Sequence, residues 1–220
     1  MLLYHGSERI IEKPVFMGGR PNNDYGYGFY CTEYPDLARE WSVSEGRSGY
    51  LNCYELDDKG LRLLDLNDHT VMNWLAILLA NRTFTVDAPL AYEAKKYILK
   101  EFMIDYEGFD LIKGYRADDS YFSFARDFIS GVISYEQLSE AMMLGDLGNQ
   151  IVLKSEESFK RIKWLSAEEV SKDVWFPKRE IRDRKAREKY YSMDKIKYVK
   201  GALYVTRVLD EEIKNNDERL

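Results

Sequence analysis

Residues 26–32 read Gly-Tyr-Gly-Phe-Tyr-Cys-Thr, a glycine turn followed directly by an aromatic run. This pattern predicts a β-strand over residues 29–32, because aromatic residues favour strands and glycines allow the tight turn before it. A second apolar run, residues 1–5, is followed at once by Gly6 and Ser7, with His5 as its last residue. We expect two buried strands whose ends carry functional groups. Two alternatives remain open: His5 is a core histidine with satisfied hydrogen bonds, and residues 26–32 form an ordinary turn and strand.

The rest of the chain shows a mixture of strand and helix patterns. Strands are expected at residues 50–56, 110–115 and 150–153, and helices at 35–46, 69–80, 90–103, 120–129 and 134–144. Ser134 with Gln137, and Ser166 with Glu169, have the spacing of a capping box, which predicts a helix after each serine. Because strands and helices do not alternate regularly, we predict an α+β fold with split, short-stranded sheets and surrounding helices.

Composition indicates one folded domain with an appendage. The chain has 220 residues, of which 45% are hydrophobic, enough for a sizeable core. We find no apolar run of about 18 residues that would span a membrane, and no signal-peptide pattern at the first residues. Cys31 and Cys53, the two cysteines, lie in strand-like contexts and suggest buried thiols in a reducing compartment. We therefore expect a cytoplasmic protein without a zinc site.

Positive charge is concentrated near the end of the chain. Residues 178–200 contain ten Lys or Arg against four Asp or Glu, although the net charge of the chain is −6. This segment belongs to a mainly helical, partly basic extension, residues 166–220, expected to pack back through Trp175, Phe176, Tyr190, Tyr191 and residues 198–208. Its basic part has four open interpretations: contact with nucleic acid, with an acidic partner, with its own domain, or a solvated helix face.

Taken together, the two glycine-containing motifs resemble the ADP-ribosyltransferase fold of the diphtheria-toxin and poly(ADP-ribose) polymerase branch. The resemblance implies that His5 binds the nicotinamide-side ribose of NAD and that Gly6, followed by Ser7, holds the carboxamide. It also implies that Tyr30 stacks on the nicotinamide, and that the aromatic residue eleven positions later, Trp41, closes the other face. A tryptophan replaces the usual tyrosine there but keeps a π face.

Gln150 stands where that branch commonly has the glutamate of its third motif, at the start of a late strand. An amide exchanges hydrogen bonds with a ribose but cannot act as a general base or offset a full positive charge. The resemblance therefore favours single transfer over polymer elongation. It also leads us to expect that Gln150→Glu accelerates the reaction, because a carboxylate would oppose the developing ribose charge. The alternative is that Gln150 only pairs within a strand.

A further set of residues resembles a bacterial group catalogued as domain of unknown function 3990. The resemblance rests on Arg20 before Asp-Tyr-Gly, on Arg116-Ala-Asp-Asp, and on the Gln-Ile-Val that starts at Gln150, and it extends over residues 2–165. It implies that Arg20 or Arg116 binds the pyrophosphate, since a guanidinium suits phosphate oxygens. Asp118 or Asp119 becomes a candidate for activating the acceptor or for bonding the ribose; the alternative is that they cap a helix.

That group is thought to be ADP-ribosyltransferase-like and is often encoded beside small partner proteins, as in toxin–antitoxin pairs. The resemblance thus implies an NAD-binding domain over residues 1–165, with NAD as a substrate and no metal. The expected function is mono-ADP-ribosylation of a nucleic acid or protein by the toxin of a toxin–antitoxin-like or phage-defence system, with a small antitoxin protein as a candidate partner. An NAD glycohydrolase and a catalytically silent binding module remain as alternatives.

Overall fold

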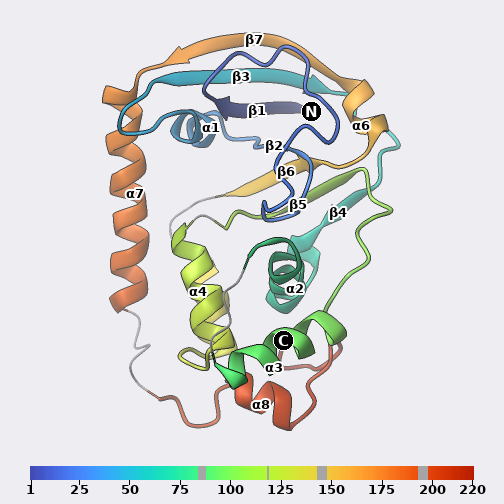
Figure 1. The fold of residues 1–220 in the computed structure, drawn as a ribbon, viewed down its shortest axis with the longest axis vertical. Coiled ribbons are helices and arrows are strands. Elements are labelled where there is room, and N and C mark those ends of the chain that lie inside the picture. Colours follow the sequence, from blue (N-terminus) through green and yellow to red (C-terminus); the bar gives the residue numbers. More distant parts are fainter. Residues whose placement is uncertain (84–87, 118, 143–147, 193–197) are drawn as a thin grey trace.

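The computed structural model describes residues 1–83, 88–117, 119–142, 148–192 and 198–220 (Figure 1). Their strands are β1 (Leu2–Ser7), β2 (Phe29–Cys31), β3 (Gly49–Leu56), β4 (Leu63–Asp65), β5 (Leu111–Tyr115), β6 (Asn149–Leu153) and β7 (Ile162–Val170). Their helices are α1 (Pro35–Ser42), α2 (Val71–Asn81), α3 (Pro89–Glu101), α4 (Asp119–Ile129), α5 (Tyr135–Met142), α6 (Glu156–Arg161), α7 (Lys172–Ser192) and α8 (Val205–Asp210), with a 3₁₀ turn, η1, at Leu66–Asp68. The α+β class predicted from the sequence is confirmed.

Two small sheets make up the strand framework. One has the order β1-β3-β7 and is antiparallel, and the other has the order β2-β6-β5-β4, with only β4 and β5 parallel. The sheets meet where Tyr4 and Thr32 exchange backbone hydrogen bonds of 2.8 and 2.9 Å. This junction brings the motif at the end of β1 beside the motif on β2, although about 25 residues separate them in the sequence.

The largest hydrophobic core lies on the helical side of the four-stranded sheet. Figure 1 shows α2, α3, α4 and α8 gathered there. Helix α2 is apolar on almost every side and is buried from Met72 to Leu79, as expected of a helix surrounded by protein. A smaller core, which includes Leu3, Tyr54 and Ile151, fills the space between the two sheets. Among the described residues, none of the helices is both long and apolar enough to cross a membrane.

Most predicted elements are confirmed, but the helix predicted from Ser166 and Glu169 is wrong. Those residues lie inside β7, where Ser166 pairs with Cys53 and Glu169 with Tyr50 of β3. A capping box contributes only about 1 kcal/mol, less than the nine-residue strand gains by pairing along β3. The capping box at Ser134 is confirmed by bonds of 2.9 and 3.3 Å with Gln137.

Helix boundaries and two short elements also differ from expectation. Helix α1 ends at Ser42 instead of near residue 46, because residues 44–47 form a tight backbone bridge that leads into β3. Strand β4 and helix α6 were not predicted from the sequence. The first has three residues, too few for a period to show, and the second begins with Ser155 as its N-cap, whose hydroxyl accepts from the Ser158 amide.

The residues assigned to the C-terminal extension are integrated into the fold. The expected boundary between residues 165 and 166 falls within β7, and α7 runs past the edges of both sheets (Figure 1). Trp175 and Phe176 pack against the core beside α1, and Tyr190 stacks on Phe124 of α4 with ring centroids 3.8 Å apart, as expected. Tyr191 and Tyr198 are instead exposed.

Candidate functional site

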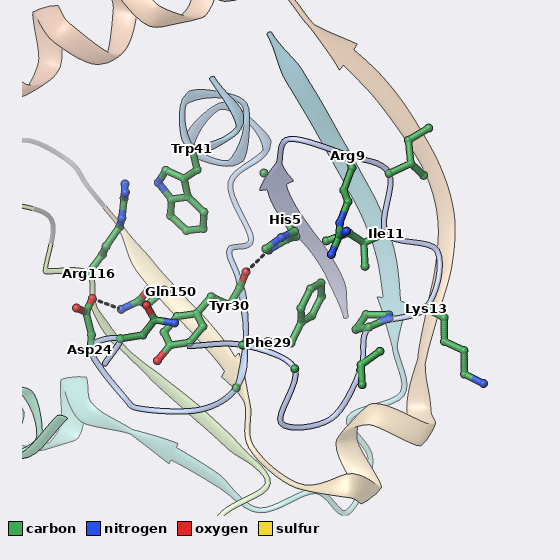
Figure 2. Close-up of a pocket in the computed structure, with 18 of the residues that line it drawn as sticks. His5, Arg9, Ile11, Lys13, Asp24, Phe29, Tyr30, Trp41, Arg116 and Gln150 are labelled. Atoms are coloured by element: carbon green, nitrogen blue, oxygen red, sulfur yellow. Dashed lines mark hydrogen bonds between the residues drawn. The ribbon is translucent and has the colours of Figure 1, made fainter. Parts of the chain in front are cut away.

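A cleft of about 900 Å³ opens where the two sheets and α1 converge. Six residues predicted for the site line it: His5, Gly6, Tyr30, Trp41, Arg116 and Gln150. Figure 2 shows Trp41 on one side of the cleft, Tyr30 and Gln150 on the opposite side, and His5 between them on β1. These residues come from four elements and, for Arg116, from the position just after β5, all distant in the sequence, so their convergence is a property of the tertiary structure.

His5 has a defined tautomer in this arrangement. Its Nδ1 lies 2.6 Å from the carbonyl oxygen of Tyr30. Because a carbonyl only accepts, Nδ1 carries the hydrogen and Nε2 is an acceptor. Burial lowers the pKa of His5, with the Tyr30 bond opposing that shift, and its ring also lies 4.5 Å from the ring of Phe29. His5 therefore offers a neutral ring with one acceptor nitrogen at neutral pH.

Gly6 and Ser7 have roles that the motif alone did not reveal. A Cβ on Gly6 would lie 1.9 Å from the Ala38 carbonyl oxygen, so glycine is needed for β1 to pack against α1. Ser7 does not line the cleft. Its hydroxyl donates to the Arg9 carbonyl and accepts from Asn52 Nδ2 at 3.0 Å. Ser7 thus helps shape the loop after β1, and Gly6 brings β1 close to α1.

Asn52 is a buried positioning residue that the sequence analysis missed. It lies on β3, and its Oδ1 accepts from the Ile11 amide at 2.8 Å while its Nδ2 bonds Ser7. Tyr54 on the same strand donates its hydroxyl hydrogen to the Ile11 carbonyl. These bonds fix the loop that brings Arg9 to the cleft (Figure 2). A polar residue within the apolar strand pattern of residues 50–56 was the available signal.

The two aromatic residues predicted to hold the nicotinamide both line the cleft. The Tyr30 hydroxyl donates to the Gly26 carbonyl at 2.6 Å and accepts from the Tyr25 amide at 3.0 Å, which fixes its ring. The guanidinium of Arg116 lies 4.7 Å from the centre of the Trp41 ring. A ligand ring that stacks on Trp41 must therefore use the other face or displace Arg116.

Gln150 is held by a buried carboxylate. Its Nε2 donates to Asp24 Oδ2 at 2.9 Å and to the Tyr115 carbonyl at 3.3 Å. Asp24 also accepts from Arg82 Nε at 2.8 Å and from the Ala117 amide at 2.9 Å. The bonds from Gln150 to Asp24 and to the Tyr115 carbonyl engage both amide hydrogens of Gln150 and leave its oxygen as an acceptor. Asp24 was quoted within a motif but not predicted as a site residue.

Basic side chains outnumber acidic ones around the cleft. Its lining includes the cations Arg9, Lys13, Arg82, Arg116 and Arg179, against the carboxylates of Glu12 and Asp24. This excess of positive charge in the lining favours an anionic ligand. Arg179 lies on α7, far beyond the motifs that predicted the site, and no local pattern could have assigned it to the cleft.

Three other predicted site residues do not contribute described side chains to the cleft. Arg20 is exposed and lies outside the lining, although the neighbouring Gly19 is part of it. Asp118 lies outside the described residues. Asp119 is the first residue of α4, and its side chain is likewise outside the described part of the chain. Of the two arginines proposed for the pyrophosphate, the geometry favours Arg116.

Comparison with known families gives one match. The model of a family described as "Protein of unknown function (DUF3990)" matches residues 1–164. No curated protein and no solved structure matches the chain. The matched residues include every predicted cleft residue, whereas α7 and its Arg179 lie beyond them.

Proposed function

The chain belongs to the DUF3990 family, and we propose that it is an NAD-dependent mono-ADP-ribosyltransferase with an ADP-ribosyltransferase-like fold. One observation carries the proposal. Residues chosen from separate motifs for their likeness to that fold, among them His5, Tyr30, Trp41 and Gln150, line a single cleft large enough for a dinucleotide. The two small sheets that meet beside β1 are also consistent with the split-sheet fold expected from the sequence.

The described groups support breaking a bond between a ribose and a neutral leaving group. In the proposed reaction the glycosidic electrons leave with nicotinamide, positive charge develops on the ribose, and an acceptor oxygen or nitrogen attacks and loses its proton. The neutral His5 Nε2 accepts from a ribose hydroxyl, and the fixed Tyr30 ring orients the nicotinamide. Arg116 binds the pyrophosphate as a charged donor.

The amide of Gln150 binds the ribose through its oxygen. Since Asp24 holds the amide hydrogens, the orientation of that oxygen is set before the ligand arrives, which lowers the cost of ordering it. Asp118 or Asp119 remains the proposed group for activating the acceptor. The acceptor is a macromolecule, a nucleic acid or a protein, modified in the cytoplasm by a toxin that a small antitoxin protein restrains.

One observation favours a second candidate, a silent binding module. The Asp24 carboxylate that is closest to Gln150 is already engaged by Arg82, Ala117 and Gln150 itself, so it is not poised as a base. Such a module would retain NAD affinity without turnover. An NAD glycohydrolase differs from the transferase only in using water as the acceptor.

The deciding experiment incubates the full chain with adenine-labelled NAD and a cell lysate and measures nicotinamide release and retained label. A transferase releases nicotinamide and leaves label that either nuclease or protease removes. His5→Ala should abolish release, whereas His69→Ala should not, because His69 is exposed and outside the cleft lining. Release without retained label would indicate the glycohydrolase. NAD binding without release would contradict both enzymes.

A further inference from the structure

Helix α7 is fixed against α1 by buried polar and apolar contacts. Arg182 of α7 lies 2.6 Å from Glu40 of α1, and the two side chains are only 15% and 10% exposed. Trp175 and Phe176 pack beside the same helix, and the Lys172 amide donates to Ser48 Oγ at 3.1 Å. The part of the chain beyond the family match is therefore anchored at the side of the cleft that carries Trp41 (Figures 1 and 2).

This anchoring brings a second guanidinium to the cleft. Arg179, one helical turn before Arg182, lines the cleft and donates to the Val43 carbonyl at 3.3 Å. Arg116 reaches the same side from the end of β5 and lies over the Trp41 ring. Two guanidiniums thus line the cleft and both act on the same carboxylate, Glu40.

Within the described part of the chain, the same corner contains buried hydrogen-bond donors that have no acceptor. Within the described chain, the buried Trp41 Nε1 and the buried Nε and Nη1 of Arg182 have no hydrogen-bond partner. Glu40 is a carboxylate of this corner, and Asp183 lies close enough to affect it. Burial raises its pKa and Asp183 adds to this effect, while Arg182, Arg116 and Arg179 oppose it. Buried donors without acceptors normally indicate a bound acceptor such as water or an anion.

We propose that Arg116 and Arg179 form a phosphate-binding subsite at the Trp41 end of the cleft, with the Glu40–Arg182 ion pair as the contact that positions α7. The planar guanidinium fork binds phosphate oxygens through paired charged hydrogen bonds, and two such forks suit a diphosphate or a phosphodiester. The identity of the phosphate compound rests on the proposed function, but the presence of the anion subsite does not.

Inorganic pyrophosphate is the probe, and its affinity for the full chain is measured by titration calorimetry at low salt. Arg179→Ala should weaken pyrophosphate binding by about tenfold or more, the loss expected for charged hydrogen bonds. Arg179→Lys should recover part of the affinity, because it keeps the charge but not the fork. The matched control is Arg184→Ala, which removes an exposed arginine of the same helix that pairs with Glu188 and does not line the cleft.

Equal affinities in Arg179→Ala and Arg184→Ala, with both variants folded by circular dichroism, would overturn the subsite. A loss confined to Arg179→Ala supports it even if the wild type never cleaves NAD, in which case the proposed function alone fails. If the wild type cleaves NAD but Arg179→Ala leaves pyrophosphate binding unchanged, the proposed function stands and the subsite is wrong. If Arg179→Ala weakens NAD as much as pyrophosphate, the subsite holds the donor; if it lowers only transfer, the subsite holds a phosphate of the acceptor.

Discussion

The structure changes what we expect of Gln150→Glu. The sequence alone led us to expect faster NAD cleavage, but the contact between Gln150 and Asp24 predicts no acceleration. The Gln150 amide nitrogen lies 2.9 Å from Asp24 Oδ2 in a buried site, so the substitution places two carboxyl groups in contact. Two negative charges at that separation repel by about 6 kcal/mol at an effective dielectric constant of ~20. The pair avoids this cost by binding one proton, which restores a hydrogen bond between the two groups.

Proton uptake limits the destabilisation and makes it depend on pH. A glutamate in the unfolded chain has a pKa of about 4.3, so holding the introduced carboxyl neutral costs about 4 kcal/mol at pH 7 and about 1 kcal/mol at pH 5. The pKa of the introduced glutamate is therefore higher in the folded chain than in the unfolded one. The variant is therefore close to wild type below the unfolded pKa and loses stability as the pH rises. A neutral carboxyl also adds no charge at the ribose, so NAD cleavage at pH 7 should not accelerate.

Urea denaturation of the wild type and Gln150→Glu at pH 5 and pH 7 measures the difference directly. Gln137→Glu is the matched control. Gln137 accepts from the Ser134 amide, and a carboxylate keeps that bond. The effect of Gln137→Glu on the free energy of unfolding should therefore change by less than about 0.5 kcal/mol between the two pH values. A destabilisation by Gln150→Glu that is the same at both pH values would refute the contact with Asp24 as the cause.

Three further predictions concern the surroundings of the cleft. Because burial lowers the pKa of His5, NAD binding should be constant at neutral pH and weaken only at pH values below the ordinary histidine range, where Nε2 gains a proton; a loss already at pH 7 in a binding titration would contradict the assigned tautomer. Asn52→Ala leaves the Ile11 amide without its acceptor and should lower the free energy of unfolding in urea by about 2–4 kcal/mol. The exposed control Asn22→Ala should lower it by less than about 0.5 kcal/mol, and equal effects would dismiss Asn52 as a loop anchor. Burial lowers the pKa of Lys154 to about 8, below the unfolded value of about 10.4, so the stability of the wild type relative to Lys154→Met should rise from pH 8 to pH 10, and a flat difference would disprove the shift.

The core of the fold could be predicted where local patterns and tertiary contacts agree. Residues 71–81 are apolar enough to form a buried helix in almost any context, and the β1 and β2 runs end where glycines and polar residues begin. Ser166 shows the limit. Its capping-box spacing is a local preference, and β3 is available to pair with residues 162–170 only once the chain has folded.

The sequence by itself pointed to six of the residues that line the cleft, because the motifs around His5, Tyr30 and Gln150 carry their own spacing. Only the tertiary structure decided what each one touches. Asp24 became the partner of Gln150 across 126 residues, and Arg179 reached the cleft from a helix whose local pattern is simply charged. The physical reason is that hydrogen bonds and charges act over a few ångströms in space, whereas sequence patterns report only on neighbours along the chain.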